Sequence, residues 1–410
     1  MRAEILCVGT EILLGDIVNT NAQYIANRLA ELGIDVYYHS VVGDNPSRLK
    51  DAYELAFSRV DLVITTGGLG PTKDDLTKEI AAEYFNREMQ LDEYSLDLIK
   101  NYYNKINRHM PKSNEKQAYF PKGSKIVKND NGTAPGFILE SEGKILIQLP
   151  GPPREMKPMM IETVIPYLKG FNDYVIESKV LRIIGVGESS AEEIISDLIE
   201  TQTNPTIAPY AKFGETTFRI TAKAKSKEEA ISMIEPLEAE LRKRFEENIY
   251  GVNHETLEDV VAKTLIKKEM TIATAESCTG GMVAARLINY PGISEVFLEG
   301  AVAYSNEAKI NRLGVSKETL DNYGAVSHET AAEMAKGIAN IAGTNIGVST
   351  TGIAGPGIGN EEKPVGLVYI GLCINGEVKT KEVNIKGDRQ AVRERATMIA
   401  LDFLRREIIK

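Results

Sequence analysis

Alternation of strand and helix patterns constrains the fold of this 410-residue chain more than any other feature. Apolar runs of strand length alternate with amphipathic segments through residues 1–165, and again from about residue 252 onward. Such alternation predicts α/β folds, with a largely parallel sheet in residues 1–165. The first amphipathic segment predicts a helix over 21–32 with Thr20 or Asn21 as its N-cap. The stretch between the two alternating regions carries strand patterns at 175–184 and 216–224 and helix patterns at 190–200 and 227–245, typical of a small α+β unit. The sequence therefore predicts three domains, at residues 1–170, 171–251 and 252–410.

Composition narrows the class of protein. The net charge of −10 argues against a broad nucleic-acid or membrane surface, because such partners need basic fields. The three cysteines form neither a CxxC pair nor a zinc spacing. No apolar run reaches about 18 residues, and the N-terminus lacks a signal-peptide pattern. We therefore expect a cytoplasmic protein without a membrane partner.

Residues 274–281 (TAESCTGG) join a β-rich run to a helical run. A nucleophile is well placed at such a turn, because amides at a helix start can stabilise an oxyanion or hold a phosphate. Ser277 is one candidate, and Cys278 is another, since a helix N-terminus lowers a thiol pKa. The alternative is a structural turn in which Thr279 is the N-cap.

Two more segments follow apolar strands, residues 304–309 (YSNEAK) and 352–359 (GIAGPGIG). Ligands bind at the carboxyl ends of strands in open α/β sheets. No histidine lies in a catalytic pattern, so Lys309, with Tyr304, is the candidate for taking the proton of Ser277. That role requires a lowered lysine pKa. The alternative is a solvated Lys309 and an interface Tyr304.

Residues 67–75 (GGLGPTKDD) follow a buried-type strand near the N-terminus. Glycines permit close approach of backbone to phosphate, and paired carboxylates can hold a hard divalent cation. The spacing is neither GxGxxG nor a Walker A loop. The alternative is a tight turn with Asp74 or Asp75 capping the next helix. Residues 9–21, 132–136 and 150–155 punctuate other strands of this region.

The motifs AESCTGG, VAYSNEAK and TTGIAGPG, in that order, resemble the C-terminal domain of the CinA family, a nicotinamide mononucleotide amidohydrolase (deamidase). The resemblance implies that Ser277 is the nucleophile, that Tyr304 and Lys309 assist it, and that no cofactor is needed. It also implies a set of contacts to the mononucleotide. The matching positions are Thr279, Gly280, Gly281, Thr351, Gly352, Gly355, Gly357 and either Arg389 or Arg393.

The N-terminal motifs resemble the molybdopterin-binding fold that forms the first half of CinA proteins. In that family the domain is associated with metal-dependent hydrolysis of ADP-ribose to AMP and ribose 5-phosphate. The resemblance implies a site for a divalent metal such as magnesium or cobalt, backbone contacts, and basic groups for the pyrophosphate. The matching positions are Asp16, Asp74 and Asp75 for the metal, Gly67, Gly68 and Gly70 for the backbone, and Lys73 and Arg154 for the charge.

The whole-chain resemblance predicts three α/β or α+β domains: a molybdopterin-binding-like α/β sandwich, a KH-like middle domain and a deamidase domain. A KH domain binds RNA through a GxxG loop. Residues 185–188 (GVGE) end in Glu188 instead, so we expect a spacer or dimerisation role and no nucleic acid. A homodimer is expected. The alternatives are an N-terminal domain that binds or adenylylates a pterin, and a competence- or recombination-associated binding protein.

Overall fold

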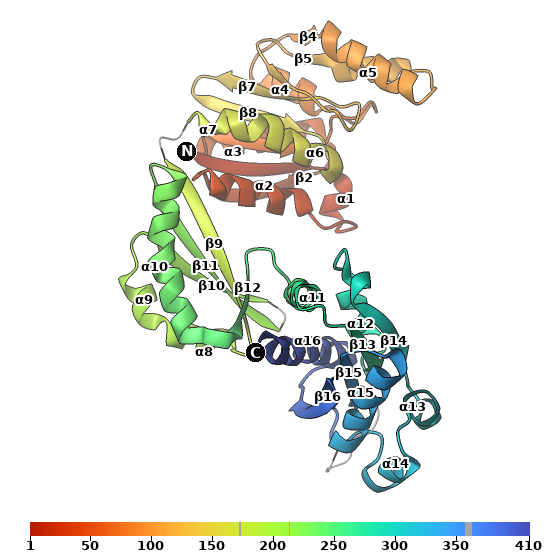
Figure 1. Ribbon diagram of the computed structural model, residues 1–410. Coiled ribbons are helices and arrows are strands. Elements are labelled where there is room, and N and C mark those ends of the chain that lie inside the picture. Colours follow the sequence, from red (N-terminus) through yellow and green to blue (C-terminus); the bar gives the residue numbers. More distant parts are fainter. Residues whose placement is uncertain (172–173, 213, 357–362) are drawn as a thin grey trace. The chain divides into compact units, whose positions relative to one another are not determined.

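The computed structural model describes residues 1–171, 174–212, 214–356 and 363–410 (Figure 1). The chain divides into two compact units, residues 1–178 with 221–233, and residues 179–220 with 234–410. Residues 171–251, predicted as a separate domain, thus contribute to both units. Among the helices of the described ranges, none is long and apolar enough to cross a membrane.

The N-terminal region contains a six-stranded sheet of order β2-β1-β3-β8-β7-β6. Strands β1, β2, β3 and β8 are parallel, and the β7–β6 edge is antiparallel. The prediction of a largely parallel sheet is therefore confirmed. The strands are β1 (Arg2–Val8), β2 (Asp35–Val42), β3 (Leu62–Thr66), β6 (Lys125–Val127), β7 (Gly136–Ser141) and β8 (Lys144–Leu149).

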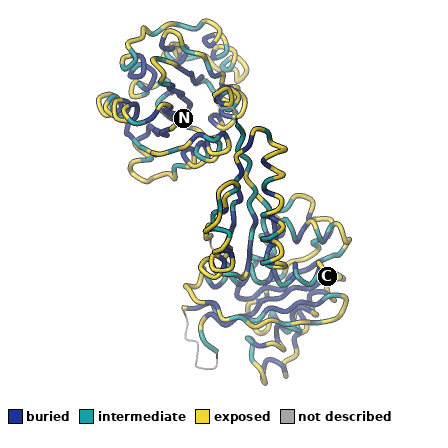
Figure 2. Tube along the Cα trace, turned by 90° about the vertical axis from the view of Figure 1, so that its left-hand side faces the viewer, coloured by how far each residue is buried: buried dark blue, intermediate teal, exposed yellow. Residues whose placement is uncertain are grey.

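Helices cover both faces of this sheet, which is why its central strands are buried (Figure 2). One core lies under α2, α6 and α7, and the other under α3 and α4. Helix α2 begins one residue earlier than predicted, with Asn19 as its cap in place of Thr20 or Asn21. The remaining elements are α1 (Thr10–Leu13), α2 (Thr20–Glu31), α3 (Pro46–Arg59), α4 (Thr77–Tyr84), β4 (Met89–Leu91), α5 (Glu93–Lys105), η1 (Lys112–Ala118), β5 (Tyr119–Pro121), α6 (Pro153–Met159), η2 (Met160–Val164) and α7 (Ile165–Lys169).

In its described residues the middle segment forms a four-stranded sheet of order β10-β11-β9-β12 with three α-helices and one 3-10 helix. Strand β9 and helix α10 have the predicted bounds. Strands β10 and β12 were not predicted, and two short helices replace the single helix expected at 190–200. The elements are β9 (Val175–Ile184), α8 (Glu188–Ile194), α9 (Ser196–Thr201), β10 (Thr206–Lys212), β11 (Glu215–Ala224), α10 (Lys227–Phe245), η3 (Glu246–Asn248) and β12 (Ile249–Val252).

The C-terminal region contains a five-stranded sheet of order β14-β13-β15-β16-β17. Strand β13 is parallel to both neighbours, and β15, β16 and β17 are antiparallel. One core lies under α11, α12 and α16, and another under α13, α14 and α15. The elements are α11 (Leu257–Lys267), β13 (Ile272–Glu276), α12 (Met282–Leu287), η4 (Ile293–Glu295), β14 (Phe297–Val302), α13 (Asn306–Leu313), α14 (Lys317–Tyr323), α15 (His328–Ala342), β15 (Ile346–Gly352), β16 (Leu367–Ile374), β17 (Glu377–Asn384) and α16 (Arg389–Ile409).

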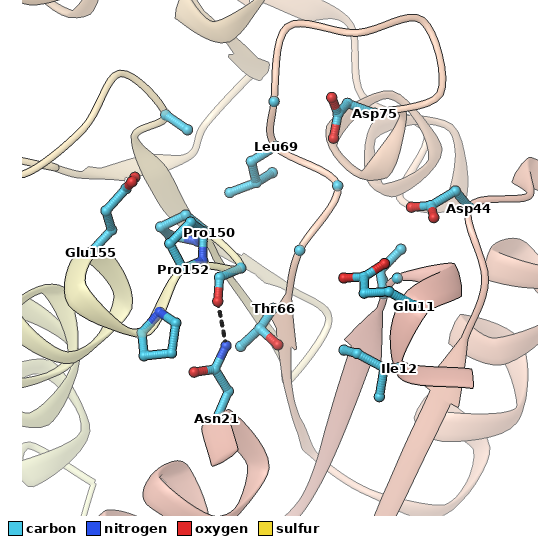
Figure 3. Close-up of a pocket in the computed structure, with 18 of the residues that line it drawn as sticks. Glu11, Ile12, Asn21, Asp44, Thr66, Leu69, Asp75, Pro150, Pro152 and Glu155 are labelled. Atoms are coloured by element: carbon cyan, nitrogen blue, oxygen red, sulfur yellow. Dashed lines mark hydrogen bonds between the residues drawn. The ribbon is translucent and has the colours of Figure 1, made fainter. Parts of the chain in front are cut away.

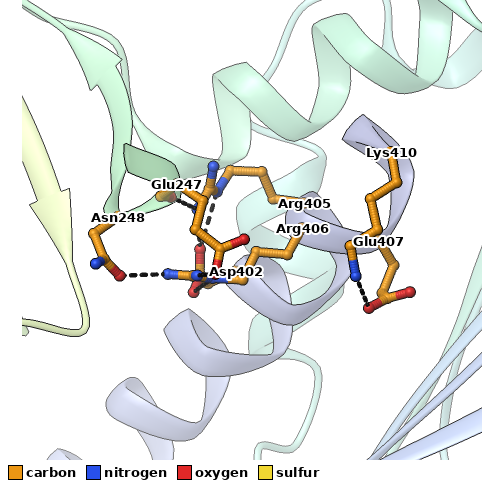
Figure 4. A network of polar contacts seen from close by, with 7 residues as sticks. All are labelled: Glu247, Asn248, Asp402, Arg405, Arg406, Glu407 and Lys410. Atoms are coloured by element: carbon orange, nitrogen blue, oxygen red, sulfur yellow. Dashed lines mark hydrogen bonds and ion pairs between the residues drawn. The ribbon is translucent and has the colours of Figure 1, made fainter. Parts of the chain in front are cut away.

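A polar network fixes the end of α16 to η3 (Figure 4). Asp402 accepts hydrogen bonds from Arg405 at 2.7 Å and from Arg406 at 2.7 Å. Arg405 also donates to the carbonyl of Glu247 at 2.6 Å, and Arg406 to Asn248 Oδ1 at 2.8 Å. Because Arg405 and Asp402 are buried, this charge pair stabilises the position of the helix whose other end carries two arginines of the candidate site.

Candidate active sites

The turn after β13 places Ser277 at the carboxyl end of a buried strand. The Ser277 amide donates to the carbonyl of Thr350 at 2.9 Å, which extends the pairing with β15 by one residue. Gly280 (φ +62°) and Gly281 (φ +95°) then turn the chain into α12 through left-handed backbone that a side chain would strain. Gly281 is the N-cap of the helix. The alternative interpretation of Thr279 as the N-cap is therefore wrong.

Glu276 occupies the amides at the start of α12. Its side chain is only 1% exposed and accepts hydrogen bonds from the amides of Gly281, Val283 and Ala284 at 2.8–3.1 Å. It also accepts from the hydroxyl of Thr279 at 2.6 Å. A carboxylate is favourable there because it meets the positive end of the helix dipole. These three amides are thus already paired with a carboxylate of the chain itself.

Lys309 reaches Ser277 across the ends of two parallel strands. Its Nζ lies 3.0 Å from Ser277 Oγ, 3.0 Å from the carbonyl oxygen of Ala303 and 3.2 Å from that of Tyr304. The lysine is 1% exposed, and burial lowers the pKa of its amine below the ordinary 10.5. In its neutral form the amine has two N–H groups for the two carbonyls and one lone pair for the serine hydroxyl. The alternative of a solvated Lys309 is therefore wrong.

Cys278 and Tyr304 lie differently from the serine and lysine. Burial raises the pKa of the Cys278 thiol to about 11, so this residue is a poor thiolate nucleophile. The ring of Tyr304 is exposed, and its hydroxyl accepts a hydrogen bond from Arg389 at 3.2 Å. The contact between Tyr304 and Lys309 is made by the tyrosine carbonyl. The structure thus separates the two candidate nucleophiles by their surroundings.

The two candidate arginines have different contacts. Arg393 donates to the carbonyls of Cys278 at 3.2 Å and Thr279 at 2.9 Å, and so holds the turn. Arg389 is exposed and donates to the carbonyl of Gly355 at 2.6 Å as well as to Tyr304. It therefore lies at the glycine segment after β15, which the resemblance predicts to contact the mononucleotide.

Two other positions predicted to contact the mononucleotide, Thr351 and Gly352, are part of the packed structure around β15. The hydroxyl of Thr351 is buried and donates to the carbonyl of Ala325 at 2.5 Å. Gly352 lies in β15, where an added Cβ would come within 2.7 Å of the Leu367 carbonyl. Gly357 lies outside the described residues.

In the N-terminal domain, a cavity of about 610 Å³ opens at the carboxyl ends of the parallel strands (Figure 3). Gly67, Gly68, Gly70, Asp74 and Asp75 line it, as the sequence predicts. Asp16, Lys73 and Arg154 do not line it, although they are near in sequence to residues that do. Several lining residues are not among the predicted positions: Glu11, Asp44, Asn21, Gln117 and Glu155.

The glycine turn of this cavity is forced by close packing. An added Cβ at Gly67 (φ +101°) would lie 2.1 Å from the carbonyl oxygen of Val8. Asp75 closes the following loop by accepting from the amide of Thr72 at 3.0 Å. Helix α4 begins after Leu76, with no side-chain cap hydrogen bond. The alternative in which Asp74 or Asp75 caps that helix is therefore wrong.

Two side chains distant in sequence hold this loop, and a buried lysine holds one of them in turn. Lys116 donates to the carbonyls of Thr72 at 2.7 Å and Asp75 at 2.6 Å, and Gln117 donates to the carbonyl of Leu69 at 3.1 Å. Lys78 is buried and donates to the carbonyl of Gln117 at 2.5 Å. Burial lowers the pKa of Lys78 to about 7. No local motif signals these residues, because the contacts span about 40 positions of the chain.

The cavity is strongly acidic. Five carboxylates line it, and its described lining contains no lysine, arginine or histidine. Figure 3 shows Glu155 across the cavity from Glu11, Asp44 and Asp75. Among the described residues no group of three acidic, histidine or cysteine side chains is close enough to hold an ion alone. Carboxylate oxygens are the ligands that hard divalent cations prefer, so Asp74 and Asp75 are the lining residues that could contribute to holding one.

The fold and the two sites define a multidomain α/β protein with a serine–lysine pair in one domain and an acidic cavity beside a glycine turn in another. Comparison with known proteins agrees with this layout. The model of the CinA C-terminal domain matches residues 254–408, that of the CinA KH domain residues 178–251, and that of a probable molybdopterin binding domain residues 4–170.

Whole-length relatives share more than half of the sequence. A protein of Clostridium acetobutylicum is 63% identical over 100% of both chains, and one of Clostridium novyi is 62% identical over 100% of this chain and 99% of its own. Both carry the provisional name competence-damage inducible protein. A crystal structure of a CinA superfamily protein from Klebsiella pneumoniae is 34% identical, covers 38% of this chain and 99% of its own, and has a TM-score of 0.37. The chain belongs to the CinA family of competence-damage inducible proteins.

Proposed function

We propose that the C-terminal domain is a serine amidase that deamidates nicotinamide mononucleotide to nicotinate mononucleotide and ammonia. The observation that carries the proposal is the 3.0 Å contact between Lys309 Nζ and Ser277 Oγ, made by a lysine shielded from water. A serine hydroxyl attacks an amide only when a base takes its proton. A buried amine with a lowered pKa is such a base.

The reaction follows from these contacts. Ser277 Oγ attacks the carboxamide carbon while neutral Lys309 takes the hydroxyl proton. The resulting ammonium returns that proton to the amide nitrogen, so ammonia leaves and an acyl-serine remains. Water then attacks the acyl carbon while Lys309 takes one of its protons. The lysine ammonium gives that proton to Ser277 Oγ as the ester bond breaks, which releases the acid and restores the serine hydroxyl. The carbonyls of Ala303 and Tyr304 keep the amine in place through both steps.

The substrate class rests on the phosphate that a mononucleotide carries. Arg389 supports it, because this guanidinium is exposed beside the glycine segment and the Tyr304 hydroxyl. Arg393 has a positioning role instead, since its contacts are to the carbonyls of the nucleophile turn.

The test is ammonia release from nicotinamide mononucleotide by the full chain. Ser277→Ala should lower kcat by at least about 10³-fold. Cys278→Ala is the matched control: it removes the neighbouring nucleophile candidate and should leave kcat within a fewfold of the wild-type value. Loss of activity in Cys278→Ala with retention in Ser277→Ala would exchange the two assignments.

We also propose that the N-terminal domain hydrolyses ADP-ribose to AMP and ribose 5-phosphate, with a divalent metal as cofactor. The supporting observation is the sign of the charge in the cavity: five carboxylates and no basic side chain in its described lining. A pyrophosphate would be repelled from such a cavity unless a cation neutralised both partners. A bound divalent cation supplies that neutralisation and an acidified water.

The chain's own groups have separate roles in this proposal. The glycine turn lets backbone approach the phosphates closely, and Asp75 and Asp74 present carboxylates beside it. The test is AMP production from ADP-ribose with added magnesium or cobalt. Asp75→Asn keeps an acceptor for the Thr72 amide but removes the charge, so it should suppress AMP production while ammonia release by the other domain is unchanged. Equal AMP production by Asp75→Asn would refute this role.

A second candidate for the N-terminal domain is pterin binding, which the match to a probable molybdopterin binding domain favours. Incubation of the full chain with metal and ADP-ribose separates the two candidates. AMP release supports the hydrolase. Absence of release together with saturable binding of a pterin supports the alternative.

A further inference from the structure

A second cavity, of about 520 Å³, lies in the N-terminal domain beside helix α5. One wall carries Tyr94, Leu98, Asn101, Tyr102 and Lys105. Their spacing (i, i+4, i+7, i+8, i+11) places them along one side of the helix. The opposite wall is residues 126–135, which connect β6 to β7. Helix α5 does not line the first cavity, and only part of residues 126–135 does, so the two cavities are separate.

The two cavities adjoin at residues 129–134. Thr133 lines both of them. Asn129, in the wall of the second cavity, donates to Glu155 Oε2 at 2.7 Å, and Glu155 lines the first. Asn129 also donates to the carbonyl of Ala134 at 3.1 Å, which fixes the intervening turn. A ligand longer than one cavity could thus pass from one to the other along Thr133.

The second cavity differs chemically from the first. It offers two tyrosine rings, three carboxamides, two lysines and one carboxylate, against the five carboxylates of the first cavity. That carboxylate, Asp130, pairs with Lys128 at 2.7 Å, which leaves Lys105 as the second basic group. The ring of Tyr102 is half-buried and meets Tyr103 edge-on at 5.9 Å, so its orientation is held by packing. The buried hydroxyl of Ser95, 1% exposed as a residue, has no hydrogen-bond partner in the described structure. Aromatic faces beside carboxamide edges are what a nucleobase needs for stacking and hydrogen bonding.

We propose that this second cavity binds the nucleobase of the nucleotide whose pyrophosphate lies in the first cavity. The inference rests on the hydrolase function proposed above for the N-terminal domain. The base stacks on Tyr102, and the exposed carboxamides of Asn101 and Asn104 read its polar edge. The ribose spans the partition at Thr133. The acidic cavity then holds only the pyrophosphate, whose charge a bound metal would neutralise.

The test uses the full chain with magnesium and measures kcat and KM for AMP release from ADP-ribose. Tyr102→Ala should raise KM about 5- to 100-fold, the range for losing one base–aromatic stack, with kcat within about threefold of wild type. Tyr102→Phe keeps the ring and should resemble wild type. Tyr37→Ala, at an exposed tyrosine of β2 outside both cavities, is the matched control. An unchanged KM in both Tyr102→Ala and Asn101→Ala would overturn the proposal.

Calorimetric titration with AMP separates failure of this inference from failure of the hydrolase function. If the wild type does not hydrolyse ADP-ribose, the hydrolase proposal fails, but AMP binding that is weakened by Tyr102→Ala still supports the cavity. Absence of AMP binding, or binding equal in wild type and Tyr102→Ala, overturns it. Asn101 is exposed, so Asn101→Ala repeats the test if Tyr102→Ala melts at a lower temperature than wild type.

Discussion

Replacement of Lys309 by Met is the sharpest perturbation of the proposed amidase. Methionine has a similar length and no titratable nitrogen, so it fills the space of a side chain that is 1% exposed. The variant loses the 3.0 Å contact to Ser277 and the two contacts to main-chain carbonyls. It therefore removes the base while leaving the nucleophile in the chain.

The expected magnitudes follow from these contacts. Loss of general base catalysis should lower kcat by about 10²- to 10⁴-fold, or about 3 to 5 kcal/mol of barrier. Stability should change less. Two buried carbonyls lose a partner, at about 1 kcal/mol or more each, but the cost of burying an amine is removed as well. We expect a folded variant whose kcat falls far more than its melting temperature.

The pH dependence gives an independent measurement. Burial lowers the pKa of Lys309 below 10.5, so the neutral, active amine appears as pH rises through that lowered pKa. The wild-type kcat should increase with pH toward a plateau below about 10.5, and the residual activity of Lys309→Met should lack this rise. The free energy of unfolding should also rise with pH, because between the pKa values of Lys309 in the folded and the unfolded chain the unfolded chain binds more protons.

The assay is ammonia release from nicotinamide mononucleotide across pH, with Lys309→Arg as control. Arginine keeps a positive charge but does not deprotonate in proteins, so this variant should be as inactive as Lys309→Met. Recovery of activity in Lys309→Arg would show an electrostatic role in place of a base. A folded Lys309→Met that retains kcat within tenfold of wild type would refute the reasoning altogether.

Three further predictions concern stability. Glu276→Gln should lower the free energy of unfolding by about 2 kcal/mol, because a charged acceptor of three amides is lost; urea unfolding measures it, and an unchanged midpoint would contradict it. Gly67→Ala should cost at least about 2 kcal/mol through left-handed backbone and the clash with Val8, whereas Gly123→Ala, with open space around it, should cost less; equal costs would contradict the packing argument. Burial lowers the pKa of Lys78 from 10.5 to about 7. Between these pH values the folded chain therefore binds fewer protons at Lys78 than the unfolded chain does. The stability of wild type relative to Lys78→Met should therefore grow by about 2 kcal/mol from pH 7 to pH 9, and a constant difference would exclude this titration.

Much of the fold could be predicted because its signals are local. Strand β9 and helix α10 have the predicted bounds, since period-2 and period-3.6 patterns act over a few residues. Short edge strands such as β10 and β12 were missed, because their pairing depends on a neighbour rather than on a pattern of their own. The cap of α2 moved by one residue to Asn19 for a similar reason: several adjacent residues can cap, and packing selects one.

The candidate sites divide in the same way. Ser277 and Lys309 could be proposed from sequence because each follows a strand end, and the parallel pairing of β13 and β14 brings those ends together. The clamp of the N-terminal loop by Lys116 could not be proposed, because it joins residues far apart along the chain. Lys73 and Arg154, which the resemblance implies for the charge of the pyrophosphate, do not line the cavity.

The sequence by itself determined the alternation of elements, the glycine turns at strand ends and the family to which the chain belongs. These properties depend on short motifs and on periodicity, which do not require distant contacts. Tertiary structure alone decided that Lys309 is buried against Ser277, that Glu276 takes the helix-start amides, and that the N-terminal cavity is acidic. Each of these depends on burial and on the approach of distant segments, and those set the pKa of a lysine and the charge that a ligand meets.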